Sequence, residues 1–410
     1  MTDLISQNAI DAVAERIQER TSKNYNIPVI GQSSNLETPQ VFEIMPFTDI
    51  DKIHCRFYAV DGSYNHHTFY NGLSLAIYRA GYVCYHYGKP VRMNATDDPV
   101  NLAQTYSPNN VLVLREDDLP SMYDECLALP PVAAFLEFCG EYPENVFAYS
   151  RDIVTARIST FLGFAQEICE WSLIYEIATR PEIALGDVVL RDGALRSLQI
   201  KQKYIVKLGR LLKDKGLRLA AITKQSPVKV ELSYTFSQVD AFLQDQLKQR
   251  YSFTNPSQSD RKLCVFFEVS EPVLLGAYGS GSMYAKKGVN GGRGCGLFFA
   301  ARLDYVEKLQ NYDWLVVDLN ILDVVPALEE KDLSRSFESV QSMMYDLTSL
   351  TQEHFILGYP YPLVEVHNAV KVQASFKDEM IARVKESLYR TRRLDHTEIE
   401  NLFIDIHNRF

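Results

Sequence analysis

The amino-acid sequence predicts an α/β protein in which a mixed sheet is flanked by helices. Apolar runs of strand length alternate with segments of helical periodicity along the 410 residues. Hydrophobic residues make up 46% of the chain and charged residues 23%, as in an ordinary globular protein. The length suits about two or three domains, or one large domain with insertions.

The first half of the chain contains the expected centre of the sheet. Residues 3–22 have the apolar spacing of an amphipathic helix, and a polar linker rich in Pro, Gly and Ser follows them. Prolines between residues 94 and 150 indicate loops with short helices. The remaining elements of this half are expected at His54–Val60 (strand), Leu73–Arg79 and Tyr82–Tyr87 (a hairpin that turns at Ala80-Gly81), 152–179 (helix ending before Arg180-Pro181), Val188–Arg191 (strand), Leu195–Lys215 (helix) and Arg218–Thr223 (strand).

The second half is expected to add strands and then helices. Apolar runs at 263–269, 273–278, 296–301 and 314–322 predict further sheet, and two final helices are expected at about 333–353 and 362–388. We divide the chain into residues 1–50 (N-terminal helix and linker), 51–385 (one large domain with insertions at about 94–150 and 276–297) and 386–410 (C-terminal tail).

The bulk composition excludes several classes of protein. The formal net charge is −10, so the whole chain lacks the basic balance typical of nucleic-acid binding, although a local basic groove remains compatible with it. The seven cysteines are odd in number and none forms a C-x-x-C pair, which argues against a zinc knuckle or a disulfide framework. No signal peptide or membrane-spanning run is visible, so the cytoplasm is the expected compartment.

Two aspartates occupy equivalent positions after apolar runs. Asp61 follows Phe57–Val60, Asp192 follows Val188–Arg191, and each is followed at once by glycine. The order of strands and helices resembles the ribonuclease H-like fold, in which the first and fourth strands lie side by side, so the two aspartates are expected to be neighbours. Two carboxylates 4 Å apart repel by ~4 kcal/mol at an effective dielectric of about 20. A divalent metal is the usual counter-charge, whereas each Asp-Gly taken alone is an ordinary turn.

A third carboxylate is expected from the helix at 152–179. This helix runs antiparallel to the strand that it precedes, so its earlier turns lie nearer the carboxyl end of that strand. Glu167, Glu170 and Glu176 are the candidates, and Glu170 is favoured because it lies on an inner turn. Each of the three could equally be a solvated helix residue.

A proline-rich segment near the C-terminus supplies further candidates. Pro360 and Pro362 restrict a loop, and Pro362 suits the first turn of a helix. His367 then lies within two turns, where it could bind a metal or carry a proton, although a lone helical histidine is more often structural. Tyr359 and Tyr361 could contact a base or a phosphate, or belong to the core.

Four motifs in succession resemble those of the NurA nuclease family, and the match covers roughly residues 50–375. The resemblance implies a manganese- or magnesium-dependent DNA nuclease with a ribonuclease H-like core. It further implies a homodimer that works with the hexameric translocase HerA to trim DNA ends. The motifs are Val60-Asp61-Gly62-Ser63-Tyr64, Asp192-Gly193-Ala194-Leu195, Ala221-Ile222-Thr223-Lys224-Gln225-Ser226, and Tyr359-Pro360-Tyr361-Pro362-Leu363 with His367.

The resemblance also implies roles for individual residues. Two metal ions ~3.5–4 Å apart would clamp the attacking and leaving oxygens of a phosphodiester, with Asp61 bridging them. The expected catalytic residues are Asp61, Glu170, Asp192, Tyr359 and His367, all but Tyr359 as metal ligands. The expected substrate contacts are Ser63, Lys224 and Tyr361.

Other interpretations of the sequence remain open. The actin-like ATPases and sugar kinases have a related core and also use Asp-Gly turns, there to hold nucleotide phosphates. A non-catalytic subunit that docks on a DNA translocase is a further alternative. The glycine-rich stretch 276–297 lacks a G-x-x-x-x-G-K-[ST] motif, which argues against a nucleotide-binding P-loop. With Lys286, Lys287 and Arg293 it is either a loop that contacts the phosphate backbone or a plain connection. Cleavage polarity, strand preference and a role in repair or in antiviral defence are left open.

Overall fold

The computed structural model describes residues 39–44, 55–92, 103–107, 112–114, 118–239, 264–278, 296–303, 314–324, 333–351, 358–372, 375–391 and 394–404, apart from the single positions 70, 88, 225, 234 and 237. Two expected features lie outside these ranges. They are the amphipathic helix at 3–22 and most of the glycine-rich stretch, including its three basic residues.

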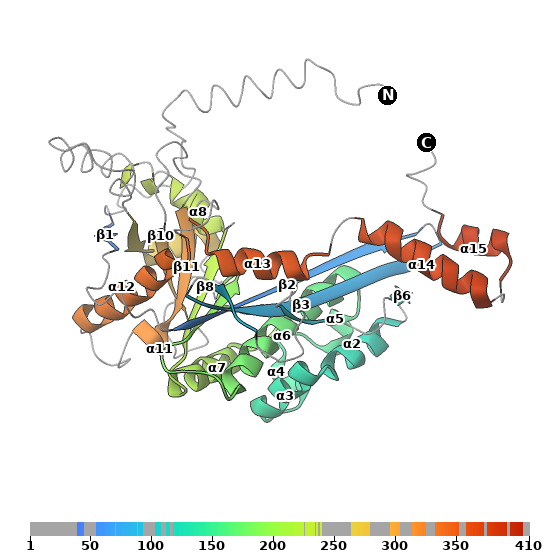
Figure 1. Ribbon diagram of the computed structural model, residues 1–410, viewed down its shortest axis with the longest axis horizontal. Helices are drawn as coiled ribbons and strands as arrows, with labels where there is room; N and C mark the ends of the chain where they lie inside the picture. Colours follow the sequence, from blue (N-terminus) through green and yellow to red (C-terminus); the bar gives the residue numbers. More distant parts are fainter. Residues whose placement is uncertain are drawn as a thin grey trace, which may run out of the picture.

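One mixed sheet forms the centre of the described residues (Figure 1). Its strands are β1 (Phe42–Glu43), β2 (Arg56–Thr68), β3 (Ser74–His86), β4 (Lys89–Pro90), β5 (Gln104–Tyr106), β6 (Leu112–Leu114), β7 (Val188–Asp192), β8 (Arg218–Thr223), β9 (Val265–Glu268), β10 (Gly296–Arg302) and β11 (Trp314–Asn320). They lie in the order β1-β9-β10-β11-β8-β7-β2-β3-β4, and β5 and β6 also pair with β3. Only the β2–β7 and β7–β8 pairs among these are parallel. The predicted α/β class with a mixed sheet is confirmed.

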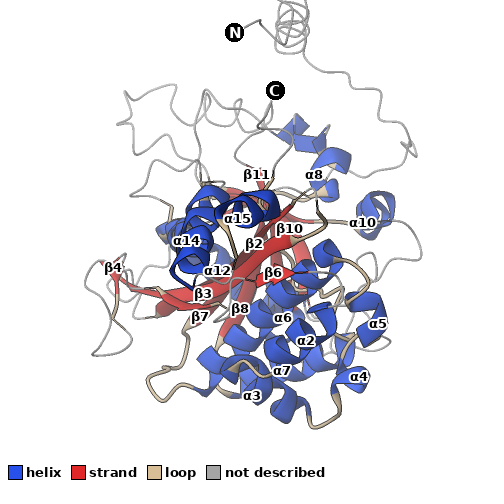
Figure 2. Cartoon of the chain, turned by 90° about the vertical axis from the view of Figure 1, so that its right-hand side faces the viewer, coloured by secondary structure: helices blue, strands red, loops and turns tan. Residues whose placement is uncertain are grey.

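Helices cover both faces of this sheet (Figure 2). They are α2 (Leu119–Leu127), α3 (Pro130–Cys139), α4 (Pro143–Val146), α5 (Arg151–Val154), α6 (Ile158–Thr179), α7 (Gln202–Asp214), α8 (Pro227–Glu231), α10 (Glu271–Tyr278), α11 (Ile321–Val324), α12 (Leu333–Ser349), α13 (Tyr361–Val370), α14 (Phe376–Thr391) and α15 (His396–Leu402). The largest core lies between one face and α2, α3, α6 and α7, and a second lies between the other face and α12 and α13. Helices α14 and α15 pack on the tip of the β2–β3 hairpin. The segment 386–410, expected as a C-terminal tail, thus contains the end of α14 and all of α15. None of the helices described here is long and apolar enough to cross a membrane.

The strand that carries Asp61 does not end there, as the sequence had suggested. Strand β2 continues through Gly62 to Thr68 and stays paired with β3 along its whole length. The glycine serves a close approach instead of a turn, because a Cβ at Gly62 would lie 2.7 Å from both Gln166 Cγ and Glu170 Oε1 of α6. The expected Asp-Gly turn at this position is therefore wrong.

The hairpin expected between residues 73 and 87 is also wrong. Strand β3 runs without interruption through Ala80-Gly81, opposite β2. A Cβ at Gly81 would lie 2.7 Å from the carbonyl oxygen of Gln104 in β5, so this glycine too permits a close approach of backbones. The two expected strands are one strand, and β5 and β6 supply the neighbours on its far side.

Three other expected elements differ from the structure because of contacts distant in sequence. The apolar run at 273–278 is helix α10, which begins at Glu271-Pro272, where proline suits a first helical turn. The helix expected at 195–215 begins only at Gln202, because Leu195 and Arg196 before it donate hydrogen bonds to Asp318 of β11. The single helix expected at 362–388 is two helices, because the backbone leaves α13 at Lys371 in an extended conformation.

Candidate metal centre

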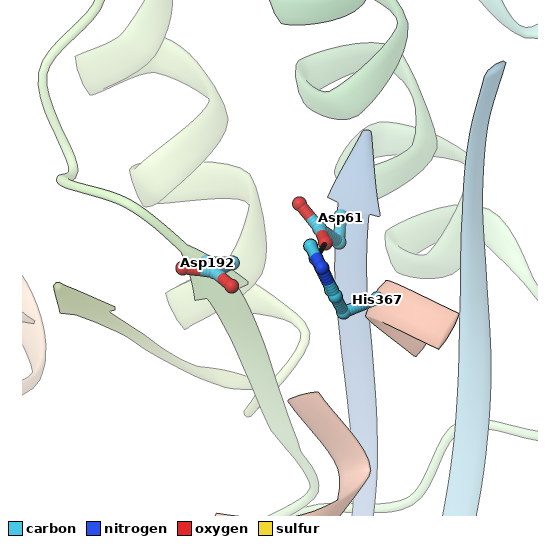
Figure 3. A group of neighbouring side chains, drawn as sticks. All are labelled: Asp61, Asp192 and His367. Carbon is cyan, nitrogen blue, oxygen red and sulfur yellow. Dashed lines mark hydrogen bonds and ion pairs between the residues drawn. The ribbon is translucent and has the colours of Figure 1, made fainter. Parts of the chain in front are cut away.

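Three of the residues singled out from the sequence meet at one point of the sheet. Asp61 in β2, Asp192 at the end of β7 and His367 in α13 each offer a ligand atom, and these atoms lie within 4.8 Å of one another (Figure 3). Asp61 and His367 are 306 residues apart, and His367 Nδ1 lies 2.9 Å from Asp61 Oδ2. The predicted convergence of the two aspartates is present in the structure.

The pairing of β2 with β7 explains this convergence. The two strands run parallel from the pair Phe57–Val188 to the pair Val60–Arg191, and the next residue of each is an aspartate. Beyond this point β2 continues with β3 alone. The carboxylates thus lie where two neighbouring strands part, with side chains free to reach a common ligand.

Helix α13 brings the histidine over this gap. The helix begins at Tyr361, one residue before Pro362, and its buried side chains Leu363, Val366 and Val370 belong to the core on that face of the sheet. Just past the helix, the Val372 N–H donates to Ser63 Oγ at 3.3 Å. Packing and this hydrogen bond hold the helix along β2 and leave His367 half-buried above Asp61.

The electrostatics of the cluster favour a metal-binding protonation state of the histidine. Burial and then the nearby Lys224 ammonium lower the pKa of His367, against an opposing effect of Asp192. A neutral imidazole is the form that binds a metal. Burial and then the Asp192 carboxylate raise the pKa of Asp61 to about 7, although the Gly62 N–H donates to its Oδ1 at 2.7 Å. The protein groups around Asp61 therefore do not offset the cost of its negative charge, and a bound cation would do so.

Lys224 and Tyr359 lie beside Asp192. Lys224 Nζ is 3.2 Å from Asp192 Oδ2 and 4.2 Å from the centroid of the Tyr359 ring, and its side chain is 43% exposed. Burial and then Asp192 raise the pKa of Tyr359 well above its ordinary value, so its hydroxyl stays protonated. This buried hydroxyl interacts with the Asp192 carboxylate, and that interaction contributes to the raised pKa.

Glu170 reaches the same region from the opposite face of the sheet. It is 2% exposed, and its Oε1 accepts from Gln166 Nε2 at 2.8 Å while its Oε2 accepts from Arg191 at 2.7 Å. Burial raises the pKa of Glu170 to about 7, and the Arg191 guanidinium opposes this. The absence of a side chain on Gly62 makes room for the carboxylate. Glu170 is thus next to the cluster but is bonded to protein groups.

The other candidate glutamates have partners elsewhere. Glu167 Oε1 accepts from the Leu198 N–H at 3.1 Å. Glu176 Oε1 accepts from the hydroxyls of Tyr82 and Tyr106 at 2.8 and 3.0 Å. Of the three, only Glu170 faces the region between the two aspartates.

Two of the expected substrate contacts have structural partners in this structure. The Tyr361 ring packs edge-on against Tyr85 with centroids 5.9 Å apart, and Tyr85 pairs with Phe57, four residues before Asp61. The structure does not bring Tyr361 to the cluster. Ser63 lies two residues past Asp61, where its hydroxyl accepts the hydrogen bond from α13.

Two charged residues outside the predicted set, Arg191 and Asp318, also support the centre. Arg191 lies directly before Asp192, and an arginine in an otherwise apolar four-residue run is the signal that could have identified it. Asp318 is fully buried in β11, where its Oδ2 accepts from the Leu195 N–H at 2.8 Å and from Arg196 at 2.7 Å. These bonds hold the segment after Asp192 against the sheet and explain why no helix forms there.

The donor set fits a divalent cation. Two carboxylates and one imidazole combine oxygen and nitrogen ligands, which suits Mn²⁺ and, less strongly, Mg²⁺. Comparisons of the chain with protein-family models, with curated proteins and with solved structures gave no match.

We expect Gly62→Ala to lower the free energy of unfolding by about 1–3 kcal/mol, because the new methyl group would overlap Gln166 and Glu170. Gly163→Ala in α6 is the matched control, since a Cβ there meets nothing within 4 Å, and alanine should stabilise the helix by about 0.5–1 kcal/mol. Urea unfolding of both variants checks this. Equal effects of the two substitutions would contradict a close approach at Gly62.

The raised pKa of Asp61 predicts a pH dependence of stability. Between the ordinary pKa of 3.8 and the folded value of about 7, the folded protein binds more protons than the unfolded chain. The free energy of unfolding should therefore fall as pH rises through this window. Chelator-treated protein should be more stable at pH 5 than at pH 8, and Asp61→Asn should reduce this difference by roughly 1–3 kcal/mol. A pH profile that Asp61→Asn leaves unchanged would contradict the assignment; Glu170 contributes with the same sign.

Proposed function

We propose that this protein is a metal-dependent DNA nuclease of the NurA type, which hydrolyses phosphodiester bonds. The observation that carries the proposal is the convergence of Asp61, Asp192 and His367, with ligand atoms within 4.8 Å of one another. These residues come from three of the motifs that resemble the NurA family. Lys224, from another of these motifs, lies beside Asp192.

The strand order supports a ribonuclease H-like core. Strands β3, β2, β7 and β8 are consecutive in the sheet, with β2 antiparallel to β3 and parallel to β7. Helix α6 precedes β7 and helix α7 follows it, as in the expected order. On this proposal β9, β10, β11 and β1 extend the core on one side.

The residues of the cluster have distinct roles in the proposed reaction. Asp61, Asp192 and His367 would hold the Mn²⁺ or Mg²⁺, which when bound supplies an activated water and neutralises charge on the phosphate. Lys224 is half-exposed at the cluster, so it can pair with a phosphate oxygen of the substrate. The Tyr359 hydroxyl remains a hydrogen-bond donor because its pKa is raised.

The remaining parts of the proposal come from the motif resemblance. They are a homodimer, a hexameric HerA-type ATPase as partner, and DNA ends as substrate, in a cytoplasmic setting of repair or antiviral defence. Saturable ATP binding by the chain alone would instead favour the actin-like alternative. A chain that binds the translocase but never cuts DNA would favour the non-catalytic one.

Asp61→Ala should reduce cleavage of end-labelled linear DNA by at least about 10³-fold, since it removes the central ligand. Purified protein is incubated with the DNA and Mn²⁺, with and without chelator. Asp152→Ala, at an exposed position on α5, is the control and should cut at the wild-type rate. Cleavage by Asp61→Ala in manganese would refute the assignment.

Lys224→Met should weaken DNA binding more than it slows the reaction of bound DNA. If Lys224 meets one phosphate, the slope of log K against log salt should fall by about one. Binding is measured with Ca²⁺ in place of Mn²⁺, at several salt concentrations. An unchanged slope would show that Lys224 does not contact a phosphate and only pairs with Asp192.

A further inference from the structure

Arg191 adjoins the candidate metal centre but faces away from it. Successive side chains of a strand point to opposite faces, so Arg191 lies on the α6 side of β7 while Asp192 lies on the α13 side. Its guanidinium carbon is 4.9 Å from the centroid of the Trp171 ring, and the residue is buried. Such a site holds the side chain in one orientation.

The two ends of the guanidinium bond to different parts of the chain. One nitrogen donates to Glu170 Oε2 at 2.7 Å, and the other donates to the carbonyl oxygen of Ala194. Ala194 belongs to the turn that follows Asp192, in which Gly193 has a φ of 130°. Arg191 therefore ties helix α6 to the segment that carries one of the metal-binding aspartates.

The connection continues to the other aspartate. Glu170 Oε1 accepts from Gln166 Nε2 at 2.8 Å, and the same nitrogen is 2.9 Å from the carbonyl oxygen of Gly62, the residue after Asp61. The path runs from the turn after Asp192, through Arg191, Glu170 and Gln166, to the backbone of β2. It crosses the gap where hydrogen bonding between β2 and β7 has ended.

We propose that Arg191 is a positioning residue of the metal centre, which fixes the spacing of Asp61 and Asp192 through Glu170 and Gln166. The metal-binding part of this inference rests on the proposed function. An arginine is required because its planar fork donates in two directions at once, whereas a lysine ammonium is a single point of contact. Loss of a residue that holds metal ligands in place typically weakens metal binding 10- to 100-fold.

Mn²⁺ binding by the full-length protein, followed by electron paramagnetic resonance, tests the inference without an activity assay. Arg191→Met should bind Mn²⁺ at least about 10-fold more weakly than wild type, with a broadened spectrum of the bound ion. Arg191→Lys keeps a charge for Glu170 but breaks the bridge, so it should lose affinity in the same direction. If Arg191→Met fails to fold, Arg191→Lys alone decides the outcome.

Arg180→Met is the matched control. Arg180 follows the last residue of α6, donates to the Tyr82 hydroxyl at 2.7 Å and pairs with Glu182, away from the cluster. Its loss should destabilise the fold while leaving Mn²⁺ affinity within about two-fold of wild type. Equal losses of affinity in Arg180→Met and Arg191→Lys, or no loss in Arg191→Lys, would overturn the positioning role.

Hydrogen exchange of the chelator-treated protein separates this inference from the proposed function. Peptides covering residues 192–196 should exchange at least about five-fold faster in Arg191→Lys than in wild type, and should be unchanged in Arg180→Met. Wild-type protein that binds no Mn²⁺ would refute the nuclease proposal. Unchanged exchange in Arg191→Lys would refute the bridge, whatever the metal result.

Discussion

Backbone hydrogen bonding between β2 and β7 ends at Val60 and Arg191, and the candidate site follows from that boundary. Up to this pair the two strands are locked in register, so the following residues, Asp61 and Asp192, must emerge side by side. Past it, β2 keeps only β3 as a partner. The resulting gap admits His367 from one face of the sheet and Glu170 from the other.

Each of the three carboxylates at this gap has one basic residue beside it. Asp61 meets the His367 imidazole, Asp192 meets Lys224, and Glu170 meets Arg191. The pairs differ in burial, so their basic side chains differ in how readily they can leave the carboxylate for a ligand. His367 and Lys224 are about two-fifths exposed and can turn toward a ligand, whereas Arg191 is anchored under Trp171. One face of the site is therefore adaptable, and the other is a rigid support.

Glycines have a related part in assembling the site. Gly62 lets Glu170 approach the plane of the sheet, and Gly81 lets β5 approach β3. Neither position has the positive φ of a turn. Gly193, by contrast, does adopt a positive φ and directs the chain after Asp192 toward Asp318. The two Asp-Gly dipeptides thus use glycine for different reasons: Gly62 for a close approach to a helix, and Gly193 for a turn with positive φ.

The sequence by itself determined the α/β class, most strand positions and the choice of Asp61, Asp192 and His367, because these depend on local periodicity and on acids placed after apolar runs. The tertiary structure alone decided that β2 passes through Asp61, that residues 273–278 are helical, and that Glu170 bonds Arg191. A local pattern cannot distinguish a glycine in a turn from one under a neighbouring helix. Which basic side chain pairs with which carboxylate depends on residues distant along the chain, which come together only when the sheet and its helices pack.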